Sequence, residues 1–134
     1  MQSHLDNPHD GKRTILVVDD FDDTRLLLRT WLERKGFRVI EAENGNQAVA
    51  EAEIGCPDLI IMDVEMPGMD GITATAALRA NTPQSAVVMM SIHDDARTRA
   101  QAQAAGAAAF VEKSGMLEVL LATIRQIVEI TGRA

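Results

Sequence analysis

A run of four apolar residues that leads straight into an acid, Leu59-Ile60-Ile61-Met62-Asp63, constrains the fold of this chain most. A turn rich in Pro and Gly follows the acid. A short, continuously apolar run of this kind is typical of a strand buried on both faces, as in a parallel sheet covered by helices. The run therefore predicts a central strand with Asp63 at its carboxyl end, where open α/β sheets place ligands and chemistry. Taken alone, Asp63 could equally serve only to cap or hydrogen-bond the loop after the strand.

The rest of the chain alternates between strand-like and helix-like segments. The expected strands are residues 14–18, 37–42, 59–63, 86–90 and 108–112, and the expected helices are 22–35, 46–53, 71–80, 95–105 and 116–130. Such an alternation, with right-handed crossovers, predicts an α/β fold in which a five-stranded parallel sheet lies between two helical layers. The strand at 37–42 is the most polar and is expected at an edge of the sheet.

Two of the expected helices carry clear local signals. Asp22 or Asp23 is predicted to cap the first helix, with Leu27 or Leu28 among the residues on its inner face. The last helix has apolar residues at a 3.6-residue period, which predicts one buried face. Those residues are Leu117, Leu120, Leu121, Ile124, Ile127 and Val128.

Length and charge limit what this fold can do. The 134 residues are enough for one domain, which we expect to span 13–134 after a flexible leader at 1–12. The net charge of −7 argues against direct binding to nucleic acid. No apolar run is long enough to span a membrane, and the polar amino terminus does not resemble a secretory signal, so a cytoplasmic location is expected.

The polar residues at the strand ends are predicted to meet at one edge of the sheet. They are Asp19, Asp20, Asp63, Ser91 and Lys113. Two carboxylates 4 Å apart repel by about 4 kcal/mol at an effective dielectric constant of 20, so a cation is needed to hold three of them together. A divalent ion that prefers oxygen ligands, Mg²⁺ above all, meets that need. A carboxylate beside a metal, an ammonium group and a hydroxyl is suited to phosphoryl transfer onto the carboxylate.

These motifs resemble the response-regulator receiver domain of two-component signalling, the CheY-like superfamily, over residues 13–130. The resemblance rests on Val17-Val18-Asp19-Asp20, on Asp63 within Asp-Val-Glu-Met-Pro-Gly-Met-Asp-Gly, on Ser91, and on Phe110-Val111-Glu112-Lys113. It implies a doubly wound, flavodoxin-like sheet with strand order 2-1-3-4-5 and five helices.

The resemblance also implies a role for each matching residue. Asp63 would accept the phosphoryl group, with Ser91 and Lys113 contacting it. Mg²⁺ would be held by Asp20, by Asp63 and by the backbone carbonyl of Glu65, while Asp19 orients a metal-bound water. Ser91 and Phe110 would form the switch that remodels the face made by the fourth helix, the fifth strand and the fifth helix.

The function implied is a signalling switch rather than an enzyme acting on other molecules. The phosphoryl donor would be a sensor histidine kinase or a histidine phosphotransfer protein, and the altered face would bind a downstream protein or a second copy of the chain. A receiver-like interaction module that works without phosphorylation is the alternative. An aspartyl phosphatase is disfavoured because Glu65 stands where that class has an Asp, and a flavin module is disfavoured because Asp19 and Asp20 would repel its phosphate.

Three positions depart from the family pattern. Ile92, directly after Ser91, is bulkier than the small residue that many receivers have there and is predicted to narrow the route to Asp63. Ser114 follows Lys113 where the family usually has a cis proline, which leaves the isomer of this peptide bond open. Glu65, two residues after the acceptor, is predicted to affect the lifetime of the phosphate, together with His93.

Overall fold

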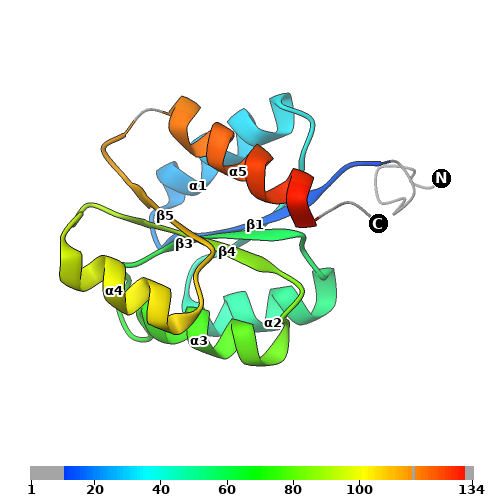
Figure 1. The fold of residues 1–134 in the computed structure, drawn as a ribbon. Coiled ribbons are helices and arrows are strands. Elements are labelled where there is room, and N and C mark those ends of the chain that lie inside the picture. The colour runs from blue at the N-terminus through cyan, green and yellow to red at the C-terminus, as the bar shows by residue number, and fades with distance from the viewer. Residues whose placement is uncertain (1–10, 116, 132–134) are drawn as a thin grey trace.

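The computed structural model describes residues 11–115 and 117–131 (Figure 1). Most of the predicted leader, and the predicted first residue of the last helix, Met116, lie outside the described residues. The strands are β1 (Thr14–Val18), β2 (Arg38–Ala42), β3 (Leu59–Asp63), β4 (Ala86–Ser91) and β5 (Ala109–Glu112). The helices are α1 (Asp22–Arg34), α2 (Gly45–Gly55), α3 (Gly71–Asn81), α4 (Ala96–Ala105) and α5 (Leu117–Thr131).

The five strands form one parallel sheet in the order β2-β1-β3-β4-β5. The predicted fold class and strand order are therefore confirmed. The polar strand β2 lies at one edge, as expected, and β5 lies at the other. All five residues of β3 are buried, which explains why its sequence is continuously apolar up to Asp63.

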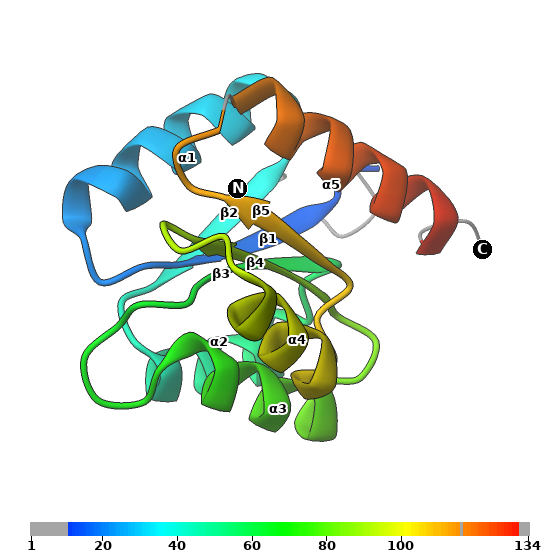
Figure 2. The same ribbon diagram turned by 60° about the vertical axis from the view of Figure 1, so that its left-hand side comes forward.

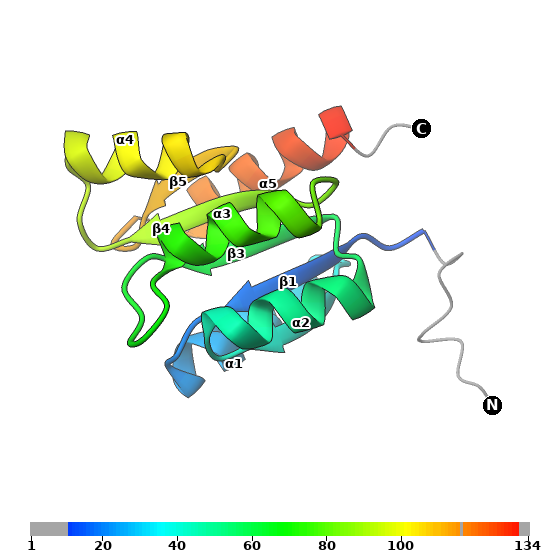
Figure 3. The ribbon, with the colours of Figure 1, turned by 90° about the horizontal axis from the view of Figure 1, so that it is seen from below.

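Helices cover both faces of the sheet: α1 and α5 lie on one face and α2, α3 and α4 on the other (Figures 1 and 2). Seen from below, α3 lies between α2 and α4 (Figure 3). Alternate residues of each central strand supply two separate cores. In β1, Ile15 and Val17 pack with α1 and α5, while Leu16 and Val18 pack toward α2 and α3. This two-sided burial is what a doubly wound parallel sheet requires.

Side-chain caps fix the starts of three helices. Asn44, Asp70 and Asp95 each accept a hydrogen bond at 2.8 Å from the backbone N–H three residues later. The predicted cap of α1 by Asp22 or Asp23 is wrong, because both acids lie within the first turn of the helix, which begins at Asp22 with Phe21 at its N-cap and no side-chain cap.

The first helix also settles a choice that the sequence left open. Leu28 is 4 % exposed and lies in the core, whereas Leu27 is 56 % exposed. Smaller differences concern the ends of elements: α1 ends at Arg34, α2 spans Gly45–Gly55, and β5 begins at Ala109. Within the described part of the chain, none of the helices has the length and apolar character needed to cross a lipid bilayer.

Candidate phosphoryl-acceptor and metal site

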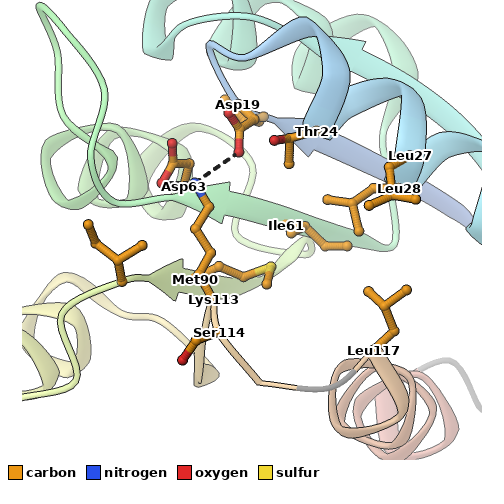
Figure 4. Close-up of a pocket in the computed structure, with 12 residues that line it drawn as sticks. Asp19, Thr24, Leu27, Leu28, Ile61, Asp63, Met90, Lys113, Ser114 and Leu117 are labelled. Carbon is orange, nitrogen blue, oxygen red and sulfur yellow. Dashed lines mark ion pairs between the residues drawn. The ribbon is translucent and has the colours of Figure 1, made fainter.

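The carboxyl ends of four neighbouring strands carry the predicted site residues. Asp63 and Ser91 are the last residues of β3 and β4, Asp19 follows β1, and Lys113 follows β5. Because all strand pairs are parallel, these ends meet at the same edge of the sheet. The structure thus brings together Asp19, Asp63 and Lys113 as the sequence predicts (Figure 4).

Three carboxylates form the polar centre of this edge. One oxygen each from Asp19, Asp20 and Asp63 lies within 4.8 Å of the others, close enough to hold one metal ion. Asp19 and Asp63 are buried and Asp20 is exposed, so the cluster opens to solvent on one side. A hard divalent cation that keeps some of its waters fits an all-oxygen cluster with one exposed member.

Lys113 is the cation that the structure places among these acids. Its Nζ lies 3.1 Å from Asp63 Oδ1 and 3.3 Å from Asp19 Oδ2 (Figure 4). Burial lowers the pKa of Lys113, but the carboxylates of Asp63 and Asp19 outweigh that effect and leave the pKa raised. The ammonium group therefore stays charged at neutral pH.

The pKa of Asp63 is raised to about 6. Burial is the main cause and the negative charge of Asp19 adds to it, while Lys113 and the backbone N–H of Glu65 act in the opposite direction. Asp63 is consequently ionised, and able to act as a nucleophile, near neutral pH and above.

The loop that carries Asp19 and Asp20 is held by a residue that the sequence analysis missed. Arg25, on α1, donates from Nη1 to the backbone oxygen of Asp19 at 2.7 Å and also pairs with Asp22 and Glu41. The only sequence signal was the three-residue spacing of Asp22 and Arg25, which indicates a helical ion pair but not the contact to the loop.

The backbone of Asp63 is packed against the start of α3. A Cβ atom at Gly71 would lie 2.2 Å from the backbone oxygen of Asp63, so no larger residue fits there without moving the acceptor strand. The Gly71 N–H donates to the backbone oxygen of Val64 at 3.0 Å, which closes the loop after β3.

Ser91 and Glu65 make a contact that the sequence did not indicate. The Ser91 hydroxyl donates to Glu65 Oε2, and the Ile92 N–H lies 3.4 Å from Glu65 Oε1. The Glu65 backbone N–H in turn donates to Asp63 Oδ1 at 3.2 Å. The carboxylate of Glu65 thus faces Ser91, while the carboxylates that cluster for a metal are those of Asp19, Asp20 and Asp63.

Phe110 on β5 is half-buried and lies near α4. The guanidinium carbon of Arg99 lies 4.7 Å from the centre of the Phe110 ring, and Arg99 also pairs with Asp94 in the loop before α4. The described residues contain no cis peptide bond, so the bond between Lys113 and Ser114 is trans.

A pocket of about 380 Å³ adjoins the acids between α1 and the start of α5. Asp19, Asp63 and Lys113 form its polar end, while the remaining wall is mainly apolar (Figure 4). The apolar residues include Leu27, Leu28, Ile61, Met90 and Leu117.

A parallel 2-1-3-4-5 sheet with clustered acids and a lysine at its carboxyl edge defines the receiver class of α/β proteins. The sequence matches the model of the response regulator receiver domain over residues 15–125. The chain belongs to this family.

Individual relatives span very different lengths. The chain is 37 % identical over 113 residues to the chemotaxis protein CheY of Bacillus subtilis, covering 84 % of this chain and 94 % of that protein. It is 38 % identical over 107 residues to a cyclic di-GMP phosphodiesterase of Thermotoga maritima, covering 80 % of this chain but only 28 % of the longer protein.

Among solved structures, the fold is similar to that of the response regulator TrrA from Thermotoga maritima in complex with Mg²⁺-BeF. The TM-score is 0.78 at 30 % identity, and the match covers 86 % of this chain and 98 % of that one.

Proposed function

We propose that this chain is a phosphorylation-controlled switch of two-component signalling, with Asp63 as the phosphoryl acceptor. The observation that carries the proposal is the placement of Asp63: a buried carboxylate at the end of β3, 3.1 Å from Lys113 and within one acidic cluster with Asp19 and Asp20. The donor would be the phosphohistidine of a sensor histidine kinase or of a histidine phosphotransfer protein.

In the proposed reaction a carboxylate oxygen of Asp63 attacks the phosphorus atom of the phosphohistidine. The P–N bond breaks, its electron pair stays on the imidazole nitrogen, and the new P–O bond makes an acyl phosphate on Asp63. Lys113 offsets negative charge that develops on the phosphoryl oxygens, and its contact to Asp63 Oδ1 holds the carboxylate in place.

Mg²⁺ is the proposed cofactor. The ion would be held by Asp20 and Asp63, together with the backbone carbonyl of Glu65, while Asp19 would orient a metal-bound water. When bound, the ion would neutralise charge on the phosphoryl oxygens. The all-oxygen cluster within 4.8 Å supports this assignment, as does the binding of Mg²⁺-BeF by the similar protein TrrA.

Ser91 and Phe110 are proposed as the switch. A phosphoryl group on Asp63 would draw the Ser91 hydroxyl toward it, and Phe110 would turn inward, away from Arg99. The face formed by α4, β5 and α5 would change shape and bind a downstream protein or a second copy of the chain. We place the chain in the cytoplasm, with 13–134 as the receiver domain, and propose no catalysis beyond its own phosphorylation and dephosphorylation.

Intact mass after incubation with acetyl phosphate and Mg²⁺ tests the proposal. We expect one phosphoryl adduct on the wild-type chain, none after Asp63→Asn, and none when EDTA removes the metal. Asp70→Asn is the matched control, because Asp70 is an exposed N-cap and Asn caps equally well, so this variant should keep the adduct. An adduct that survives Asp63→Asn contradicts the assignment, and a wild-type chain that binds Mg²⁺ but takes no phosphoryl group favours the phosphorylation-independent module.

A further inference from the structure

The contact between Glu65 and Ser91 has a more specific meaning than the predicted influence of Glu65 on phosphate lifetime. The two oxygens of the Glu65 carboxylate are directed at two donors at the end of β4, the Ser91 hydroxyl and the Ile92 N–H. A hydroxyl and a backbone N–H, close together at the end of a strand and beside a lysine, are the kind of donors that bind an oxyanion. In this structure a carboxylate of the chain itself lies on them.

The Ser91 hydroxyl has no proton left for another acceptor. It has one O–H, which it donates to Glu65, while its oxygen accepts the His93 N–H at 2.9 Å. A phosphoryl oxygen on Asp63 can therefore gain this hydrogen bond only after Glu65 has released it.

Glu65 is also tied to the acceptor itself. Its backbone N–H donates to Asp63 Oδ1 at 3.2 Å, so the residue bridges the ends of β3 and β4. Two like charges separated by about 4 Å repel strongly where water is partly excluded, so a phosphoryl group and the Glu65 carboxylate cannot share these donors.

We propose that Glu65 is an internal competitor of the phosphoryl group: its carboxylate occupies the Ser91 and Ile92 donors in the resting state and must swing out before they bind phosphate. This inference rests on the proposed function of Asp63 and deepens it. Glu65 thereby sets how readily the chain accepts a phosphoryl group, because the incoming group has to replace the charge-assisted hydrogen bond between the Ser91 hydroxyl and the Glu65 carboxylate.

Two substitutions separate competition from simple charge repulsion. Glu65→Ala removes both the charge and the contact, whereas Glu65→Asp keeps the charge on a side chain one methylene shorter, which cannot span to both donors. If Glu65 competes for the donors, both variants should bind beryllofluoride in the presence of Mg²⁺ more tightly than the wild-type chain. We expect a gain of about tenfold, equivalent to one charge-assisted hydrogen bond.

The assay is titration of beryllofluoride followed by ¹⁹F NMR, with the rate of adduct formation from acetyl phosphate as the second readout. Mg²⁺ affinity is measured for each chain without beryllofluoride, and the beryllofluoride titrations are run at saturating Mg²⁺, so that a change in Mg²⁺ affinity cannot account for the gain. In a Ser91→Ala background, Glu65→Asp should give a smaller gain, because only the Ile92 donor is then left to compete for.

The outcomes distinguish this inference from the proposed function. If only Glu65→Ala binds beryllofluoride more tightly, the effect of Glu65 is charge repulsion and the competition is overturned. The competition is also overturned if the wild-type chain is phosphorylated but both variants bind beryllofluoride equally well or more weakly than it does. The competition is supported if the wild-type chain binds beryllofluoride poorly and both Glu65 variants bind it well. If neither the wild-type chain nor any variant takes a phosphoryl group or beryllofluoride, the proposed function of Asp63 fails and this inference fails with it.

Discussion

Replacing Asp63 with Asn should stabilise the fold, and the gain should depend on pH. Asp63 is 2 % exposed and has a pKa of about 6 in the folded chain, against about 3.9 for an unfolded Asp. The folded state therefore binds this proton more tightly than the unfolded state does. The stability that results is fully present below pH 4 and is lost as the pH rises through 6.

The magnitude follows from the two pKa values. Above pH 7 the ionised carboxylate costs the wild-type fold about 3 kcal/mol relative to a neutral side chain, because a tenfold change in proton affinity is worth about 1.4 kcal/mol. At pH 4.5 the same comparison gives about 1 kcal/mol. The Asp63→Asn variant should thus be more stable by these amounts, since Asn carries no charge to bury.

Urea unfolding at pH 7.5 and pH 4.5, with EDTA present, measures both values. Asp70→Asn is the control, because the same substitution at an exposed N-cap should change the free energy of unfolding by less than about 0.5 kcal/mol. A variant less stable than the wild-type chain at pH 7.5, or a difference that does not change with pH, would refute the argument that burial and Asp19 raise the pKa of Asp63.

Three further predictions test the core and the surroundings of the site. Leu120→Ala should lower the free energy of unfolding by about 2 to 5 kcal/mol because Leu120 is 1 % exposed. The neighbouring Val119→Ala, at a 53 % exposed position, should lower it far less. Equal losses in urea unfolding would contradict the assigned buried face of α5. Gly71→Ala should cost about 1 to 3 kcal/mol in the same assay, because its Cβ would lie 2.2 Å from the Asp63 backbone oxygen, and an unchanged stability would show that the loop yields freely. Lys113→Met removes the ammonium group 3.1 Å from Asp63 and should raise the pKa of the Asp63 carboxyl further. NMR titration of the Asp63 side-chain carbon measures this pKa. An unchanged or lower pKa would count against the ion pair between Lys113 and Asp63.

Much of the fold was predictable because its signals are local. The apolar runs at β1, β3 and β4 mark buried strands whatever surrounds them, and Asp70 and Asp95 mark helix starts through hydrogen bonds to residues only three positions away. The failed cap of α1 shows the limit of such signals. The Phe21 N–H donates to the side chain of Asp19, the acid that follows β1, and this contact holds the loop so that Phe21 takes the N-cap position.

The candidate site divides in the same way. The sequence by itself determined that Asp19, Asp63, Ser91 and Lys113 lie at one edge, because each follows a parallel strand and parallel strands end on the same side. It also determined the chemical character of that edge, since three acids and a lysine must neutralise one another or bind a cation.

Only the tertiary structure decided the contacts between these ends. Glu65 and Ser91 are 26 residues apart, and their hydrogen bond depends on how the loop after β3 folds back against β4. Arg25 reaches the Asp19 backbone only because α1 packs beside β1 and β2. Such contacts arise from the packing of several elements at once, so no pattern within a single stretch of sequence could specify them.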